Sequence, residues 1–314
     1  MRLFLAGAAV CLLSLSCPIC LSAQDAPKPQ PIPSASGKPI TAVPEPSQST
    51  APSPQRHEAV PAGAERHFRA GVSFEHDGNA ENAIAEYKQA IKEYPDYFDA
   101  HFSLGNLYLD HKGYAEAATE FKTAVRLRPD NADAHSNLGI ALKHNGDLNG
   151  ALIEYREAVR LNPKLATAQN NLANVLYAKR DYAGAIQHYR AALEVQPKNA
   201  ETRMNLGSVL DDAGHHDEAI AEYKEAIKLD PKNAGAHYNL SLVYQNTKNL
   251  PAAIAELQQA AKLSPDWPTP HIMLTNLLKD SDPRAAFDEC VIADGLTHDA
   301  KLHDECSELQ KKVR

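Results

Sequence analysis

The residues 132–165 read ADAHSNLGIALKHNGDLNGALIEYREAVRLNPKL, and this stretch decides the fold. Apolar residues in its first half recur at i, i+4, i+7 and i+8, which is one stripe of a helix: Ala134, Leu138, Ala141 and Leu142. Gly146 ends this helix, and Asp147 can cap the next one. A second apolar stripe runs from Leu148 to Val159, and Pro163 stops it. The stretch therefore predicts a helical hairpin.

The hairpin is repeated along the chain. A proline recurs every 34 residues, at Pro95, Pro129, Pro163, Pro197, Pro231 and Pro265. These prolines define six units without insertion: 64–97, 98–131, 132–165, 166–199, 200–233 and 234–267. Each unit has a small residue at its eighth, twentieth and twenty-seventh places and a large one at its twenty-fourth. Small residues let paired helices approach to ~8–10 Å, and the large side chain fills the space beside them.

This period and this small–large pattern resemble the tetratricopeptide repeat (TPR) family over residues 64–267. The resemblance implies an all-α fold, a right-handed α-solenoid of helix–turn–helix units, used for protein–protein interaction. Residues 268–297 are expected to form a degenerate seventh unit whose second helix ends at Gly295. Residues 298–314 are expected to form a terminal capping helix with a polar outer face.

The N-terminal region has a different composition. In residues 1–23, Arg2 precedes an apolar run and a small-residue exit, the layout of a secretory signal peptide cleaved before Gln24. The run of 13 residues is shorter than the ~20 needed to span a bilayer. An uncleaved anchor and a lipoprotein at Cys17 remain alternatives. Residues 24–63 contain ten prolines and are expected to be an extended, disordered linker. We therefore expect a periplasmic or secreted bacterial protein that is not inserted in the membrane after cleavage.

The chain is acidic, with a net charge of −8. Arg2 adds one positive charge and the charges of residues 24–63 cancel, so residues 64–314 carry −9. Nucleic acids and anionic lipids need clustered cations, and the composition argues against both as partners.

Asparagine occupies the sixth place in four successive units: Asn137, Asn171, Asn205 and Asn239. Each precedes a leucine of the buried stripe and so lies about 100° away from it. Stacked first helices place these amides in a row on the inner, concave surface. An amide both donates and accepts hydrogen bonds, which suits the backbone of an extended peptide. Asn106, Asn174 and Asn276, three residues further along the same face, would widen the row.

The row resembles the asparagine ladder in the TPR superhelix of O-GlcNAc transferases, although this chain has no catalytic domain. The resemblance implies that the groove holds extended polypeptide; alternatively, duplication copied a harmless polar residue. Asp133 and Glu201 on the same face favour a neutral or basic peptide. The fifth place lacks the Lys and Arg of TPR proteins that grip a terminal carboxylate, which argues against that activity; it holds Phe102, Ser136, Asn170 and Met204.

Two further places carry titratable side chains. The fourth place holds His67, His101, His135, Gln169, Arg203 and His237. Equivalent residues of neighbouring repeats should lie ~10 Å apart, whereas zinc needs nitrogens at ~2.0–2.1 Å, so we expect packing residues and no metal site. The twenty-third place holds glutamates that we expect to face solvent as helix-stabilising partners of lysines: Glu86, Glu120, Glu154, Glu222 and Glu256.

Cys290 and Cys306 are the two cysteines that remain after signal cleavage. They lie on successive antiparallel helices of an exported chain, so we expect a disulfide, which would stabilise by roughly 3 kcal/mol in the chain-entropy model.

No catalytic motif is visible: the sequence has no glycine-rich phosphate loop, no nucleophile elbow and no His-Glu-x-x-His helix. We expect a non-enzymatic scaffold without cofactor. Two alternatives remain open. One is a structural solenoid that self-assembles into homo-oligomers, and the other is an accessory subunit of a cell-envelope enzyme or assembly machine.

Overall fold

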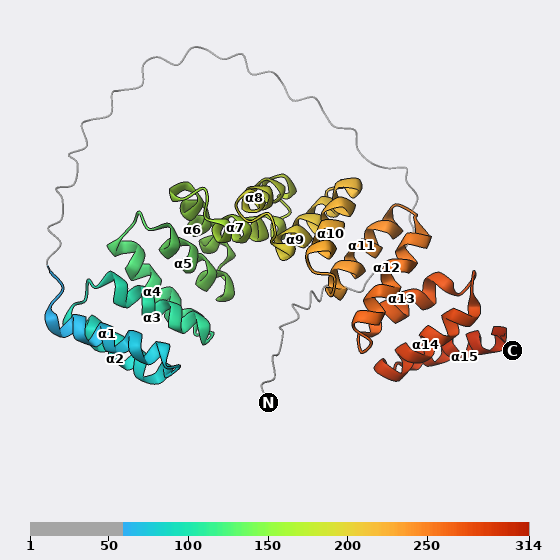
Figure 1. Ribbon diagram of the computed structural model, residues 1–314, viewed down its shortest axis with the longest axis horizontal. Coiled ribbons are helices and arrows are strands. Elements are labelled where there is room, and N and C mark those ends of the chain that lie inside the picture. The colour runs from blue at the N-terminus through green and yellow to red at the C-terminus, as the bar shows by residue number, and fades with distance from the viewer. Residues whose placement is uncertain (1–58, 314) are drawn as a thin grey trace, which may run out of the picture. The chain divides into compact units, whose positions relative to one another are not determined.

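The computed structural model describes residues 59–313, which form fifteen helices and no strand (Figure 1). The predicted signal peptide and nearly all of the predicted linker, in residues 1–58, lie outside the described residues, as does Arg314. The helices are α1 (Ala62–His76), α2 (Ala80–Glu93), α3 (Phe98–Asp110), α4 (Tyr114–Leu127), α5 (Ala132–His144), α6 (Leu148–Leu161), α7 (Ala166–Ala178), α8 (Tyr182–Val195), α9 (Ala200–Asp212), α10 (His216–Leu229), α11 (Ala234–Asn246), α12 (Leu250–Leu263), α13 (Pro268–Leu278), α14 (Pro283–Thr297) and α15 (Ala300–Val313).

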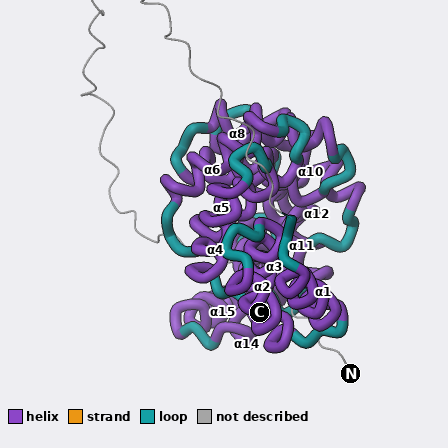
Figure 2. Tube along the Cα trace, turned by 90° about the vertical axis from the view of Figure 1, so that its left-hand side faces the viewer, coloured by secondary structure: helices purple, strands orange, loops and turns teal. Residues whose placement is uncertain are grey.

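The helices form a right-handed solenoid of consecutive hairpins. Each second helix packs against the first helix of its own unit and against the first helix of the next unit. Successive first helices from α3 to α11 also contact one another. In the middle of the solenoid, α5, α7 and α9 lie on the inner side of the curve and α6, α8 and α10 on the outer side (Figure 1). Short loops join all of them (Figure 2). The first helices therefore line the concave surface, as expected.

The turn inside each hairpin requires a left-handed backbone at the fifteenth place of the unit. Glycine supplies it in three units, where Gly78, Gly146 and Gly214 have φ of 73°, 87° and 83°. The other three units use a long basic residue: Lys112, Arg180 and Lys248 have φ of 61°, 62° and 59°. An L-residue pays roughly 1–2 kcal/mol for this conformation. In four units the next residue then caps the second helix through its side chain; these are Asn79, Asp147, Asp181 and Asn249.

The small–large pattern packs the two helices of each unit together. A Cβ added to Gly139 would lie 2.6 Å from the ring of Tyr155, and one added to Gly71 would lie 2.6 Å from the ring of Tyr87. The alanines of the twentieth place are fully buried in all six units: Ala83, Ala117, Ala151, Ala185, Ala219 and Ala253. The close approach predicted from these residues is therefore present in the structure.

The C-terminal part differs in detail from the prediction. Gly295 does not end α14, which continues to Thr297 and ends where His298 adopts the left-handed conformation, with φ of 52°. One glycine in a helix costs only ~1 kcal/mol, and packing of the helix outweighs it. The buried stripe of α14 runs through Ala286, Cys290 and Ala293, and Ile292 is exposed. At the other end, α1 begins at Ala62, before residue 64.

Candidate peptide-binding groove

The asparagines of the sixth place lie on α5, α7, α9 and α11, the first helices of four successive units. All four side chains are half-buried: Asn137, Asn171, Asn205 and Asn239. The leucine that follows each of them is buried in the solenoid core: Leu138, Leu172, Leu206 and Leu240. The asparagines therefore lie at the edge of the core on the inner side of the helix row, where a ligand can reach them.

Hydrogen bonds divide these amides into two groups. The Nδ2 atom of Asn137 donates to Oδ1 of Asn106 on the preceding first helix, at 2.8 Å. The side chains of Asn171, Asn205 and Asn239 form no hydrogen bond within the described residues, although they are only partly exposed. Half-buried amides without a protein partner are available to a ligand backbone. The free part of the row therefore spans α7, α9 and α11.

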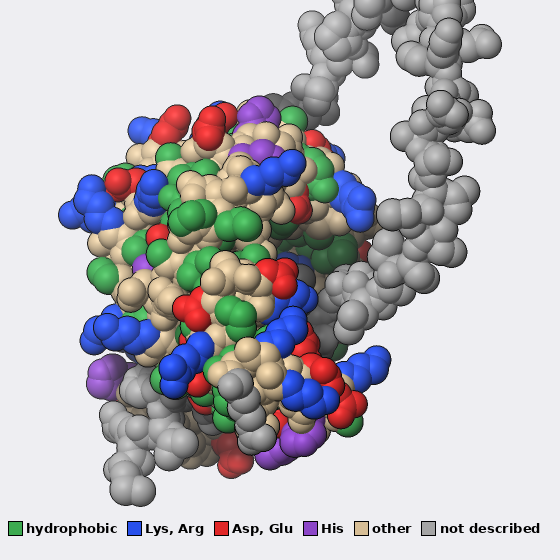
Figure 3. All heavy atoms as spheres, turned by 90° about the vertical axis from the view of Figure 1, so that its right-hand side faces the viewer, with side chains coloured by type: hydrophobic (Ala, Val, Ile, Leu, Met, Phe, Trp, Pro, Cys, Tyr) green, Lys and Arg blue, Asp and Glu red, His purple; other side chains and the backbone are tan. Residues whose placement is uncertain are grey.

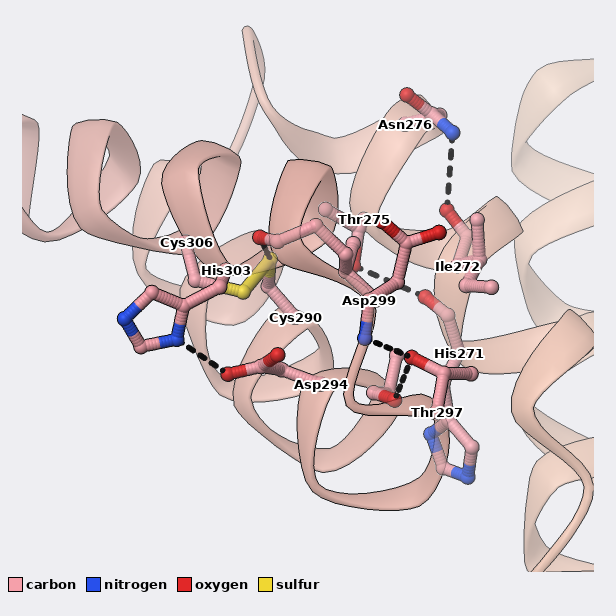
Figure 4. The surroundings of a disulfide bond; sticks show 12 residues. His271, Ile272, Thr275, Asn276, Cys290, Asp294, Thr297, Asp299, His303 and Cys306 are labelled. Atoms are coloured by element: carbon pink, nitrogen blue, oxygen red, sulfur yellow. Dashed lines mark hydrogen bonds and ion pairs between the residues drawn. A yellow bond between two sulfur atoms is a disulfide. The ribbon is translucent and has the colours of Figure 1, made fainter.

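The asparagines of the ninth place have other roles. Oδ1 of Asn174 accepts the hydroxyl of Tyr189 from the second helix of the same unit. Asn276 is exposed, and its Nδ2 donates to the carbonyl of Ile272 at 3.1 Å (Figure 4). Asn106, Asn174 and Asn276, which were expected to widen the row, therefore all have hydrogen-bond partners within the protein.

The acidic residues of the concave face differ in the same way. Asp99 pairs with Arg128 at 3.3 Å, and Asp212 accepts the hydroxyl of Tyr177 at 2.7 Å. Asp133 and Glu201 are exposed and form no ion pair within residues 59–313. Lys143 is the nearby cation; burial lowers its pKa, and the charge of Glu201 opposes that shift. Asp133 and Glu201 are therefore unpaired carboxylates that could meet a ligand.

The glutamates of the twenty-third place do not face solvent beside lysines, so that prediction was wrong. In each of the six units the fourth-place side chain contacts the twenty-third-place side chain across the hairpin. Glu154 Oε2, for example, lies 2.6 Å from Nδ1 of His135. The unit with Gln169 at the fourth place carries His188 at the twenty-third, so the two residue types are exchanged and the contact remains. Helix spacing within one element could not reveal this pair, because its members lie 19 residues apart on different helices.

The same contact occurs between α13 and α14. His271 Nδ1 lies 2.5 Å from Glu289 Oε2, and the two residues are 18 positions apart in the sequence in place of 19. α14 begins 15 positions after the start of α13, one fewer than the 16 positions between the starts of α11 and α12, and the pair is retained.

The tyrosine of the twenty-fourth place was expected only to fill space, but its hydroxyl is also used. Tyr223 OH lies 2.8 Å from Ser208 Oγ, and Tyr87 donates to Glu75 at 2.5 Å. In the third unit the ninth place holds Ile140, and the buried hydroxyl of Tyr155 has no partner within the described residues. These bonds fix the first helix against the second beneath the groove.

Aromatic pairs lie in the first and the sixth units. The rings of Phe68 and Tyr97 lie 5.1 Å apart in the first unit, and those of Tyr238 and Trp267 lie 4.8 Å apart in the sixth. Both pairs join the fifth place of a unit to its last place. The sixth-unit pair is half-buried and adjoins Asn239, so it offers an apolar surface at one end of the free amides.

Two other predicted features lie away from the groove. Cys290 of α14 and Cys306 of α15 form a disulfide, with Cα atoms 5.5 Å apart (Figure 4). This separation lies within the usual range for disulfides. His216, the first residue of α10, pairs with Asp211 of α9 at 2.7 Å. No group of residues within 59–313 has the arrangement needed to hold a metal ion.

Comparison with known proteins accounts for the repeat. The sequence profile of the tetratricopeptide repeat matches residues 102–166, 170–233 and 204–268, and a second TPR profile matches residues 77–112. The chain belongs to the tetratricopeptide repeat family. TPR units are generally non-catalytic modules that bind protein or peptide partners. No match is found among curated proteins.

Solved TPR structures share the fold. YrrB, described as a TPR protein with an unusual peptide-binding site, is 23% identical with a TM-score of 0.52; the match covers 57% of this chain and 93% of YrrB. PilF of Pseudomonas aeruginosa is 20% identical with a TM-score of 0.57, covering 67% of this chain and 96% of PilF. A TPR protein of Parabacteroides merdae is 17% identical with a TM-score of 0.58, covering 79% of this chain and 98% of that protein. At these identities the likeness concerns the fold alone. Within residues 59–313, no helix has the length and apolar character needed to cross a membrane.

Proposed function

We propose that this TPR protein is an exported, non-enzymatic scaffold that holds an extended segment of a partner protein in its concave groove. The observation that carries the proposal is the set of three successive half-buried amides, Asn171, Asn205 and Asn239, which form no hydrogen bond inside the described chain. A side-chain amide can satisfy both the N–H and the C=O of one peptide residue, independently of that residue's side chain.

The spacing of the repeats sets a register for the ligand. Neighbouring first helices lie ~10 Å apart, and an extended peptide advances ~3.3 Å per residue. Successive asparagines would therefore contact every third residue of the segment. The exposed carboxylates of Asp133 and Glu201 favour neutral or basic side chains between these contacts.

The proposed location is outside the cytoplasm, in the periplasm or the medium of a bacterium. It rests on the signal-like pattern of residues 1–23 and on the disulfide between Cys290 and Cys306, since structural disulfides persist in oxidising compartments.

The experiment starts from the mature chain, used to capture envelope proteins and then to map the bound segment with synthetic peptides. A triple variant with Asn171→Ala, Asn205→Ala and Asn239→Ala should bind the peptide at least tenfold more weakly, because several hydrogen bonds are removed. The matched control is Gln187→Ala, Gln258→Ala and Gln259→Ala, three exposed amides on the outer helices α8 and α12.

A peptide scan tests the mode of binding. N-methylation of one backbone nitrogen at a time should weaken binding at every third position of the peptide. Equal affinity of the amide variant and its control, with both equally helical by circular dichroism, would refute binding through the asparagine row.

A second candidate is a self-assembling solenoid, and one observation favours it. Val291, Ile292 and Leu296 of α14 are exposed at the C-terminal end, where a second copy could dock. The face seen in Figure 3 has hydrophobic side chains at the surface among charged ones. A mass that rises with concentration in sedimentation, and that is lowered by Val291→Ser with Ile292→Ser, would favour this candidate.

A further inference from the structure

Two of the fourth-place histidines have hydrogen-bond acceptors at both ring nitrogens. His135 Nδ1 lies 2.6 Å from the Glu154 carboxylate of α6, and its Nε2 lies 3.1 Å from the carbonyl oxygen of Pro129 in the preceding loop. His101 has the same geometry, at 2.6 Å from Glu120 of α4 and 2.9 Å from the carbonyl of Pro95. We call this arrangement a clamp. In each clamp, a histidine of a first helix contacts the second helix of its own unit and the end of the preceding unit.

The proton count of such a clamp follows from its geometry. A neutral imidazole has one N–H donor and one lone pair, whereas a carboxylate oxygen and a carbonyl oxygen only accept. Both contacts are satisfied only if the pair of histidine and glutamate holds one proton more than imidazole and carboxylate together. Without that proton, a ring lone pair would face an oxygen lone pair in a site where the histidine side chain is 9% exposed. A contact so buried is screened little by solvent.

Two neighbouring units contain the same clamp without this proton. Arg203 donates to Glu222 at 2.7 Å and to the carbonyl of Pro197 at 2.9 Å, so a permanent cation replaces the imidazolium. Gln169 donates to the carbonyl of Pro163 at 2.8 Å, and its Oε1 lies 2.7 Å from Nδ1 of His188. This version is complete with a neutral imidazole. The hydrogen bonds of the clamps in the fourth and fifth units are therefore complete near neutral pH without an added proton on a histidine.

We propose that protonation of the His135 clamp sets the rigidity of the N-terminal limb, from α3 to α6, while the clamps at Gln169 and Arg203 keep α7 to α10 rigid on either side of neutral pH. The ligand recognised by the His135 clamp is the proton. The inference stands whether or not the groove binds peptide.

The direction of the effect follows from the charges around His135. The hydrogen bond to Glu154 raises the pKa of His135, burial opposes this, and the carbonyl of Pro129 and Glu157 of α6 add to the increase. A histidine whose pKa is higher in the folded chain stabilises fully below the unfolded value of about 6.5. This contribution is lost as the pH rises through the folded value, so the limb should loosen toward alkaline pH.

The opposite behaviour is expected of His188 in the neutral clamp. Burial and the charge of Arg156 lower its pKa, so it donates as a neutral ring across the same range. The segment from α7 to α10, which contains the neutral clamp, thus serves as an internal reference for α3 to α6 in the wild-type chain.

Hydrogen exchange of the full chain, corrected for intrinsic exchange rates, tests the proposal between about pH 6 and about pH 8.5. Opening of the amides of α3 to α6 should increase roughly tenfold relative to those of α7 to α10, as expected for the loss of a charge-assisted hydrogen bond. The variant His135→Arg copies the clamp at Arg203 and should show no such increase. Equal pH dependence of hydrogen exchange in α3 to α6 and in α7 to α10 would overturn the proposal. So would an unchanged increase of exchange in the arginine variant.

A second measurement does not depend on the variant folding. The imidazole of His135 in the wild-type chain is titrated by NMR and assigned by loss of its signal in His135→Gln. The expected result is a midpoint above that of His188. A midpoint of His135 at or below that of His188 refutes the protonated clamp.

Discussion

The hydroxyl oxygens of Tyr223 and Ser208 lie 2.8 Å apart, joining the second helix of the fifth unit to the first. The equivalent hydroxyl of Tyr155 in the third unit is buried opposite Ile140 and has no partner within the described residues. An orphaned buried hydroxyl costs ~1–3 kcal/mol, whereas a satisfied one contributes ~1 kcal/mol.

We therefore expect Tyr155→Phe to leave the stability unchanged or to raise it, and Tyr223→Phe to lower it by ~1 kcal/mol. Both changes remove one oxygen from a fully packed ring, so each is the control for the other. Urea unfolding of the two variants, followed by circular dichroism, measures the difference. A loss in Tyr155→Phe as large as that in Tyr223→Phe would mean that the hydroxyl of Tyr155 has a partner.

Arg180 occupies the left-handed turn between α7 and α8, with φ of 62°. Replacing it by glycine should stabilise the chain by ~1 kcal/mol, because glycine adopts this conformation without a Cβ penalty. The reverse change, Gly146→Arg, should destabilise by a similar amount, since an added Cβ there meets no other atom and only the backbone matters. Thermal melting of both variants measures the effect. Stabilities that change in the same direction would contradict this account of the turn.

Ala185 is fully buried between α7 and α8, whereas Ala183 is exposed on the same helix. Ala185→Leu should overpack the hairpin and cost ~1–3 kcal/mol. Ala183→Leu adds the same atoms in solvent and should have little effect. The comparison is made by urea unfolding. Wild-type stability in Ala185→Leu would count against the close helix approach.

The disulfide joins α15 to α14, and three residues of α15 are buried beside it: Leu302, Cys306 and Leu309. A thiol count on the unreduced mature chain should find no free cysteine. Reduction should expose α15 to limited proteolysis while the repeats keep their helicity, because the bond contributes roughly 3 kcal/mol in the chain-entropy model. Two free thiols in the unreduced chain would show that the bond does not form in solution.

Much of this protein could be predicted from its sequence, because a helical hairpin is a local structure. The 34-residue spacing of Pro95 to Pro265, the buried alanines and the large residue of each unit fix helix ends and packing faces. The placement of Asn171, Asn205 and Asn239 beside the buried stripe follows from the same periodicity.

The tertiary structure alone decided which polar groups are engaged. Asn137 forms a hydrogen bond with Asn106 of the preceding unit, and His135 contacts Glu154 on the other helix of its own hairpin. Such partners lie on different helices, and their contact depends on how those helices rotate and approach, which a pattern along one helix does not contain. The periodicity of the sequence therefore determined the solenoid and the row of amides, and the packing of the helices decided which amides remain free and which partner each fourth-place side chain contacts.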